Sequence, residues 1–246
     1  NHCTWILRCF YDGKDYMPVL RSFVEREAKR EYETRPTSKA KPRLNMNYAL
    51  ELMDLYGAFP TAVSHTKEYV PFYQGYGVTP VTPEPIVCFN GYNRAEEMAE
   101  AWSETEKIAD GTIPIGEFFA KGRGDHATDI IESMWGNLGK KFYINSPNRG
   151  AVGNLPDDAF LELLCDLDMK GPRPRPVGDM PRGLLGLTQQ VLDTHELTVE
   201  AAVSCDRRIL LRALATDPLV NNLSDAKHIM AELLEAERDH LDRRWF

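Results

Sequence analysis

Helical periodicity is the feature that most constrains the fold of this chain, because it recurs along most of its length. The longest helical stretch runs from Leu184 to Leu219 and is expected to break near Glu196. A final helix is expected from Ser224 to Arg238, with Ser224 as its N-cap. Four earlier helices are predicted at Met17–Tyr32, Met46–Tyr56, Arg94–Ala109 and Asp125–Trp135. Pro18 near the start of the first and Gly57 after the second are typical helix boundary residues.

Short apolar runs supply the strand candidates. One runs from Thr4 to Tyr11 and ends at the turn residues Asp12-Gly13, and two others cover Lys141–Asn145 and Ala159–Leu167. The proline-rich stretch Gly171–Val177 is predicted to be a rigid, extended linker. Loops are expected at Glu33–Arg43 and Gly75–Tyr92, with an irregular stretch at Thr61–Tyr73. The pattern predicts an α+β fold in which helices dominate.

Composition limits the size of the fold and the class of partner. A length of 246 residues, 43% of them hydrophobic, fits one large domain or two small ones. The formal net charge of −8 argues against nucleic acid or an anionic membrane as the main partner. No apolar run reaches the roughly 18 residues that a membrane-spanning helix needs. No signal-peptide pattern is visible at the N-terminus.

The cysteines indicate a reducing environment. There are five of them, an odd number, and none occurs in a Cys-x-x-Cys spacing. Most lie among apolar neighbours, as Cys165 does, where a free cysteine acts as a small hydrophobic residue. We therefore expect a cytoplasmic protein.

Three sets of residues are candidates for chemistry, and each has a plainer interpretation. His2 beside Asn1 is one metal ligand at most, because a metal site needs three or four and the chain has no His-x-x-x-His. Tyr69, with His65 and Lys67 nearby, is either a packing residue or a general base.

The third set is the amide-rich loop from Asn145 to Pro156. It contains Asn148, Arg149 and Asn154 between two glycines. Amides in such loops often cap turns, and the alternative is that they bind sugar hydroxyls. Gly122-Arg123-Gly124 is too short for a phosphate-binding loop and is interpreted as an ordinary loop.

Several short motifs occur in an order that resembles family 4 of the glycoside hydrolases. They are Asn1-His2 with Trp5, Gly13-Lys14-Asp15 with Pro18-Val19-Leu20, His65 with Glu68, Tyr69 and Pro71, Gly124-Asp125-His126-Ala127, Asn145 to Pro156, Gly178-Asp179-Met180-Pro181, Thr198 to Ala202, and Ala213-Leu214 through Asp217-Pro218-Leu219. Each motif is weak alone, and their common order carries the resemblance over nearly the whole chain.

The resemblance implies that residues 1–246 form one C-terminal domain, the substrate and catalytic domain of this family. Its fold would be helix-rich α+β with a mixed or antiparallel sheet, like the substrate domain of lactate and malate dehydrogenases. The glycine motif of a nucleotide-binding Rossmann domain and the family's metal-binding cysteine are missing. Cys3 and Cys9 do not replace that cysteine, because they follow the histidine. The chain alone is therefore expected to be an inactive fragment.

The resemblance also implies a redox route for cleaving glycosides, outside the two-carboxylate mechanism. NAD would oxidise sugar C3, and a divalent metal such as Mn²⁺ would polarise the resulting ketone. A base would then remove the C2 proton, the C1 substituent would leave, and water would add before the steps reverse. His2 matches the metal ligand and Tyr69 the base, whereas Asn1 and Asn148 match substrate-binding positions. The cofactor-binding residues stay unknown.

The Glu-Tyr-x-Pro sequence around Tyr69 resembles that of the α-galactosidase, α-glucosidase and α-galacturonidase branch more than that of the 6-phospho-glycosidases. The expected partner is a small glycoside, and homo-oligomers are expected from the family. Two alternatives remain open, namely the substrate domain of a 2-hydroxy-acid dehydrogenase and a non-catalytic sugar-binding or assembly module. The first would need an arginine for a carboxylate and a His–Asp pair, and no such spacing is evident.

Overall fold

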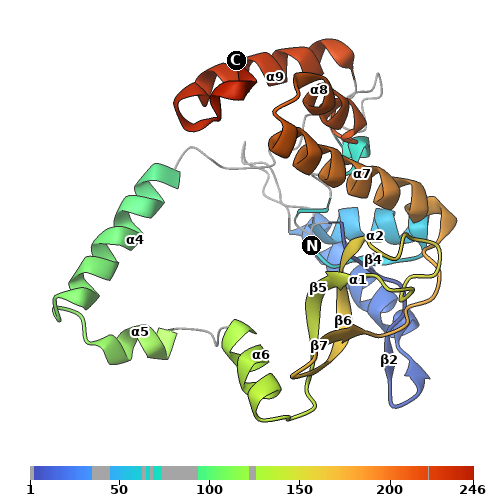
Figure 1. Ribbon diagram of the computed structural model, residues 1–246. Coiled ribbons are helices and arrows are strands. Elements are labelled where there is room, and N and C mark those ends of the chain that lie inside the picture. The colour runs from blue at the N-terminus through green and yellow to red at the C-terminus, as the bar shows by residue number, and fades with distance from the viewer. Residues whose placement is uncertain are drawn as a thin grey trace. The chain divides into compact units, whose positions relative to one another are not determined.

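The computed structural model describes residues 3–34, 45–62, 65–66, 69–73, 94–121, 126–220 and 222–246 (Figure 1). The chain divides into two compact units, one of residues 1–86, 152–155 and 178–246, the other of residues 87–151 and 156–177. Most of the described residues lie in helices, as Figure 1 shows, so the expected helix-rich α+β class is confirmed. Within the described residues, no helix is long and apolar enough to cross a membrane.

The first unit begins with two small antiparallel ladders. Strand β1 (Trp5–Ile6) pairs with β4 (Phe59–Pro60). Strand β2 (Phe10–Tyr11) pairs with β3 (Lys14–Asp15). The hairpin between β2 and β3 turns at Asp12 (φ 48°) and Gly13 (φ 72°), so the predicted Asp-Gly turn is confirmed.

Two packed helices follow the hairpin. Helix α1 (Met17–Glu33) has its proline in the first turn, and α2 (Asn45–Tyr56) ends at Gly57, whose φ is 67°. Both predictions are confirmed to within a residue. The helices bury Val24, Ala49 and Met53 against each other. The carboxylate of Glu31 accepts a hydrogen bond from the Met46 amide at 2.7 Å, which satisfies a free N–H of the first turn of α2.

A second cluster of buried side chains joins distant parts of the sequence. It consists of Trp5, Leu52, Ala58, Val70 and Leu184. These residues belong to β1, α2, the α2–β4 connection, the segment after Tyr69 and helix α7 (Arg182–Ser204). We call this set the Trp5–Leu184 core.

We expect Leu184→Ala to lower the free energy of unfolding by about 2–5 kcal/mol, because Leu184 is fully buried and truncation leaves a cavity. Urea unfolding followed by circular dichroism measures this change. Val203→Ala on the same helix is the control, because Val203 is exposed and its loss should cost less than about 0.5 kcal/mol. Equal effects of the two substitutions would contradict the Trp5–Leu184 core.

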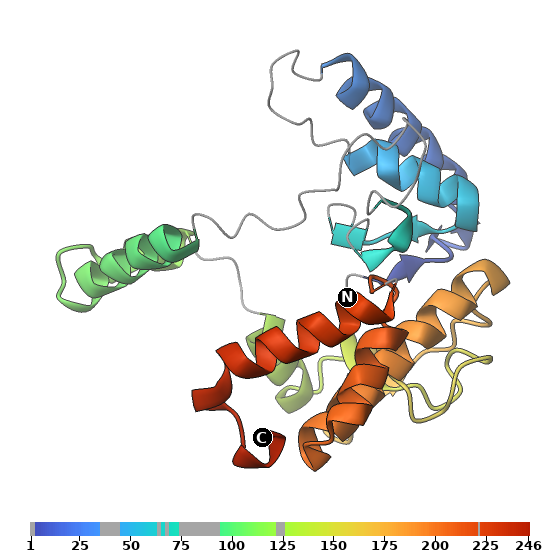
Figure 2. The same ribbon diagram turned by 90° about the horizontal axis from the view of Figure 1, so that it is seen from above.

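The C-terminal helices are α7, α8 (Arg207–Thr216) and α9 (Leu223–Ala236), coloured orange to red in Figure 2. The predicted break near Glu196 is wrong, since α7 continues through it and ends at Cys205 in the left-handed region (φ 56°). Glu196 favours helix, and the real boundary is set by Asp206, whose side chain caps α8 by accepting from the Arg208 amide at 2.7 Å. Hydrogen bonds from Arg208 to this carboxylate lower the pKa of Asp206.

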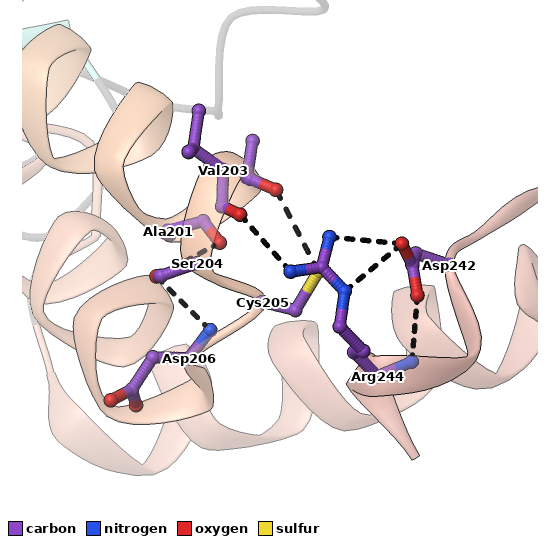
Figure 3. Close-up of polar contacts among 8 residues, drawn as sticks. Ala201, Val203, Ser204, Cys205, Asp206, Asp242 and Arg244 are labelled. Atoms are coloured by element: carbon purple, nitrogen blue, oxygen red, sulfur yellow. Dashed lines mark hydrogen bonds and ion pairs between the residues drawn. The ribbon is translucent and has the colours of Figure 1, made fainter.

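Arg244 stabilises the end of α7 (Figure 3). Its guanidinium donates to the Val203 carbonyl at 3.5 Å and forms an ion pair with Asp242 at 2.9 Å. A positive charge at the C-terminal end of a helix interacts favourably with the helix dipole. Cys205, at the end of α7, and Trp245, the residue after Arg244, pack with Ala201 and Leu234 in one buried cluster.

The predicted N-cap of the last helix is also wrong. Asn222, rather than Ser224, precedes the first turn of α9, and its side-chain oxygen accepts from the Asp225 amide at 2.8 Å. Asparagine caps helices as well as serine does, so N-cap preference alone does not distinguish Asn222 from Ser224.

The second unit contains an antiparallel sheet in the order β5 (Lys141–Pro147), β6 (Phe160–Asp168), β7 (Gly171–Pro174). Strands β5 and β6 confirm their predictions, and α6 (His126–Trp135) contacts β6. The linker prediction is wrong for its first half, because β7 pairs with β6. Pro172 and Pro174 alternate with Arg173 along β7, so the backbone nitrogens of both prolines, which carry no hydrogen, can point away from β6. Arg173 between them is opposite Asp166 in the register. This is how a proline-rich segment serves as an edge strand.

Two further helices precede the sheet in sequence. Helix α4 (Arg94–Ala109) was predicted, whereas α5 (Ile115–Lys121) was missed. Helix α5 has only 7 residues, which is too short for a clear periodic signal.

Candidate functional site

Tyr69 lies next to a residue that is anchored in the interior. The side chain of Val70 is fully buried in the Trp5–Leu184 core, whereas that of Tyr69 is 38% exposed. A short 3-10 helix, Pro71–Tyr73, follows directly. The buried side chain of Val70 and the proline-started turn after it restrict the backbone that follows Tyr69, and Tyr69 itself stays partly exposed.

The residues that lead to Tyr69 form a compact turn. The amides of His65 and Thr66 both donate to the Ala62 carbonyl, at 2.7 and 2.8 Å. The Thr66 hydroxyl donates to the same carbonyl at 3.1 Å, and its side chain is fully buried. The predicted irregular stretch therefore consists, in its described part, of short helical turns.

Three aromatic rings pack against one another in this region. The rings of Trp5 and Tyr56 meet edge to face with centroids 5.3 Å apart, and Tyr56 lies 6.4 Å from Phe72. Gly183 leaves room for this arrangement, because a Cβ there would lie 3.2 Å from the Tyr56 ring. Burial raises the pKa of Tyr56, so this phenol stays protonated at neutral pH. Sequence analysis missed Tyr56 and Phe72, since no motif links them to Tyr69.

The start of the chain is tied to the segment that precedes Tyr69. The Thr4 carbonyl accepts from the Thr61 amide at 3.0 Å and from the Thr61 hydroxyl at 3.1 Å. Asn1 and His2, the predicted substrate and metal residues, lie outside the described residues. Burial raises the pKa of Cys3 to about 11, so its thiol is protonated at neutral pH.

Asn148 is placed where its amide serves the loop. Its side chain is 0% exposed, and its amide nitrogen donates to the Pro156 carbonyl at 3.0 Å. Its backbone amide donates to Ala159 at 2.8 Å, and the chain turns at Arg149 and Gly150, both with positive φ. The turn-capping interpretation accounts for these contacts, and a role in substrate binding stays a prediction.

Asn154 also uses its side chain within the protein. Its amide nitrogen donates to the Met180 carbonyl at 2.9 Å, and its oxygen accepts from the Met180 amide at 2.8 Å. The two-way bond fixes the loop to the residues just before α7. Asn154 is therefore a structural residue of the amide-rich loop.

We expect Asn148→Ala to lower the free energy of unfolding by about 1–3 kcal/mol, because it removes the hydrogen bond that the fully buried Asn148 side chain donates to the Pro156 carbonyl. Urea unfolding of the purified chain checks the value. Asn145→Ala is a matched control on β5, where the side chain is exposed and the expected change is below about 0.5 kcal/mol. If the Asn148→Ala protein were as stable as the control, the fold would not depend on the Asn148 amide, and this outcome would favour a role of Asn148 in ligand binding.

The described residues do not complete a metal site. Over the ranges that the structure describes, no group of three or more His, Cys, Asp or Glu side chains is arranged to hold an ion. His2, the predicted ligand, lies outside those ranges. A stable site needs three or four.

Comparison with known proteins agrees with the resemblance seen in the motifs. The model of the family 4 glycosyl hydrolase C-terminal domain matches residues 1–220. An α-galactosidase of Bacillus subtilis (strain 168) is 28% identical over 246 residues, which covers 98% of this chain and 54% of the relative. An α-galacturonidase of the same strain is 27% identical, covering 96% and 52%. The chain spans about half the length of the curated relatives it matches over its whole length.

Solved structures show the same fold. A 6-phospho-α-glucosidase from gut microorganisms, in complex with NAD and Mn²⁺, superposes with a TM-score of 0.68 at 22% identity. The match covers 96% of this chain and 52% of that structure. With the family model covering most of the sequence, the chain belongs to family 4 of the glycosyl hydrolases, as its C-terminal domain.

Proposed function

We propose that this chain is the substrate-side half of an enzyme that hydrolyses O-glycosidic bonds by NAD-assisted oxidation, elimination and addition. The observation that carries the proposal is the setting of Tyr69, which is open to solvent while its neighbour Val70 is fixed in the Trp5–Leu184 core. A general base must be held rigidly and still be able to reach the substrate. The partial exposure of Tyr69 and the burial of Val70 support this role.

In this proposal Tyr69 takes the proton from sugar C2. When bound, NAD and a divalent metal such as Mn²⁺ supply the oxidation at C3 and the Lewis acid that makes the C2 proton acidic enough to remove. The Tyr69 hydroxyl must come within hydrogen-bond reach of that proton, at about 2.6–3.2 Å between heavy atoms. Asn1 and Asn148 are the proposed substrate-binding residues.

His2 is the one metal ligand that we assign to this chain. Within the described residues no three His, Cys, Asp or Glu side chains are arranged to hold an ion, so we propose that the site needs His2 together with further donors. A histidine nitrogen is a suitable ligand for Mn²⁺ beside oxygen donors.

For the substrate we propose an α-glycoside without a phosphate group. The whole-length relatives include an α-galactosidase and an α-galacturonidase, and also two maltose-6'-phosphate glucosidases and a 6-phospho-α-glucosidase, so the choice between the two groups is based on the sequence around Tyr69. The Glu-Tyr-x-Pro wording at Tyr69 supports the first group.

The test uses the whole enzyme, with this chain joined to a family 4 nucleotide-binding domain. Aryl α-galactosides and α-galacturonides should be cleaved only with NAD⁺ and Mn²⁺, and with kcat/KM at least about 100-fold above that for 6-phospho-α-glucosides. Faster cleavage of the phosphorylated substrates would overturn the substrate proposal alone. Cleavage without NAD⁺ would overturn the mechanism.

We further propose that residues 1–246 make one substrate and catalytic domain, with the topology of the substrate domain of lactate and malate dehydrogenases. We place the protein in the cytoplasm. The buried free thiols of Cys165 and Cys205 support a reducing compartment.

A further inference from the structure

A small cleft opens where helix α7 ends and helix α8 begins. It has a volume of about 430 Å³ and is lined by residues 204–208 and 244–246. Small-molecule sites in proteins have volumes of about 300–1,000 Å³, so this cleft is large enough for a small ligand. We call it the α7–α8 cleft. Its lining residues all belong to the first unit, and neither Tyr69 nor Asn148 is among them.

Three arginines determine the charge of the α7–α8 cleft. Arg207 and Arg208 are the first two residues of α8, and Arg244 belongs to the short 3-10 helix η3 (Arg243–Trp245). Asp206 is the acidic side chain in the lining. The lining side chains therefore carry three positive charges and one negative charge, in a chain whose formal net charge is −8. A local excess of positive charge attracts anions.

Hydrogen bonds and ring contacts tie the walls of the cleft together. Nε of Arg207 donates to the Trp245 carbonyl at 2.7 Å, and the Arg207 guanidinium carbon lies 5.6 Å from the centre of the Phe246 ring. On the α7 side, Arg244 donates to the Val203 carbonyl at 3.5 Å, as Figure 3 shows. Arg207 and Arg244 are thus partly ordered before any ligand arrives, which lowers the entropy cost of binding.

Two aspartates hold one edge of their arginines and leave other donors unused. Asp206 accepts from Nε and Nη2 of Arg208 at 3.3 and 3.0 Å. Asp242 accepts from Nε and Nη2 of Arg244 at 3.1 and 2.9 Å. Among the residues that the structure describes, Nη1 of Arg208 and both Nη atoms of Arg207 have no hydrogen-bond partner. Since exposed ion pairs contribute little free energy, they leave these guanidinium groups available to a second anion.

The chemistry of these donors favours phosphate. A guanidinium group presents its N–H groups as a planar fork, which matches pairs of phosphate oxygens. A plainer interpretation is that the arginines only close the corner between α7 and α8. That interpretation explains the bonds of Arg244 and Nε of Arg207, but it gives no role to the unused donors of Arg207 and Arg208.

We propose that the α7–α8 cleft binds a phosphate dianion, either as free orthophosphate or as the phosphate group of a small monoester. Arg207 and Arg208 donate to its oxygens, and Arg244 supplies further positive charge. A dianion balances the excess positive charge of the lining side chains. The site is separate from Tyr69, and binding does not require the proposed glycosidase activity.

Equilibrium dialysis of the 246-residue chain against radiolabelled orthophosphate, at pH 7.5 and constant ionic strength, tests the site. We expect one phosphate per chain with a Kd on the order of 0.1–1 mM. Competition with glycerol 3-phosphate distinguishes the two sources of the ligand. Tighter binding of glycerol 3-phosphate than of orthophosphate supports a monoester, and weaker binding supports the free anion.

Substitutions of single arginines locate the site. Arg208→Gln should raise the Kd for orthophosphate at least about 10-fold, the scale for losing a hydrogen bond between charged groups, and Arg207→Gln should do the same. Arg207→Lys keeps the charge and loses the fork, so its Kd should rise about 3-fold or more. Arg243→Gln is the matched control, because it removes the same charge beside Arg244 and does not line the cleft. Its Kd should stay within about 2-fold of the unsubstituted chain.

Three outcomes would overturn the proposal. They are an absence of saturable binding up to about 10 mM orthophosphate, unchanged binding in Arg207→Gln/Arg208→Gln, and an equal loss of binding in Arg243→Gln. Thermal unfolding without phosphate accompanies each variant, because Arg207→Gln also removes the bond to Trp245. If that variant is less stable, Arg208→Gln decides alone, since the Arg208 side chain is 89% exposed and its loss leaves the bond to Trp245 in place.

Discussion

Replacing Tyr69 by phenylalanine should reduce kcat of the whole enzyme by roughly 100-fold or more, the typical loss when a general base is removed. The substitution deletes one hydroxyl and keeps the ring, and the side chain is already partly exposed, so folding should not change. Exchange of the substrate C2 hydrogen with solvent deuterium should disappear together with turnover. Exchange is the sharper measurement, because it reports proton removal alone, whether or not the glycoside is cleaved.

The control for Tyr69→Phe is Tyr143→Phe on β5. Tyr143 is exposed and loses the same hydroxyl, so kcat, KM and exchange should stay within about 2-fold. A Tyr69→Phe enzyme with normal turnover and normal exchange would make Tyr69 a packing residue. A drop in kcat with normal exchange would move Tyr69 from proton removal to a later step.

The elements that sequence analysis predicted correctly are those whose boundaries are set by neighbouring residues. Pro18 and Gly57 act through their own backbone preferences, and Asp12-Gly13 makes its turn without help from the rest of the chain. Glu196 was chosen as a break where no such residue exists, whereas the real break at Cys205 depends on the Asp206 cap and on packing against Trp245.

Strand β7 shows the limit of local reasoning most clearly. Proline is compatible with an extended linker and with an edge strand, and only the pairing with β6 distinguishes the two. That pairing joins residues through the register of a sheet, which no short window of sequence contains.

The candidate site divides in the same way. The motif around Tyr69 suggested this residue as the base, whereas the contacts around it come from other parts of the chain. Val70 joins a core with Leu184, and Tyr56 packs close to Gly183, where a Cβ would lie 3.2 Å from its ring. The amide-rich loop from Asn145 to Pro156 suggested Asn148 for sugar binding, and the burial of Asn148 and its bond to Pro156 depend on how that loop closes. A motif names residue types, and packing decides which side chains reach solvent.

Replacing His2 by alanine should lower metal affinity of the whole enzyme at least about 100-fold and abolish metal-dependent turnover, because a site of three or four ligands loses one of them. Trp5, three residues after His2 in the sequence, and Val70, the neighbour of Tyr69, belong to the same buried core.

Metal content after gel filtration, measured by elemental analysis, tests the His2 assignment without relying on activity. His228→Ala is the matched control, since His228 is exposed on α9 and should leave metal content unchanged. Circular dichroism should be the same for the parent and both variants, because β1 is held by its pairing with β4 and by the Thr4–Thr61 bonds. Full metal occupancy in His2→Ala would remove His2 from the site while leaving the Tyr69 assignment standing, since proton exchange at C2 tests that residue separately.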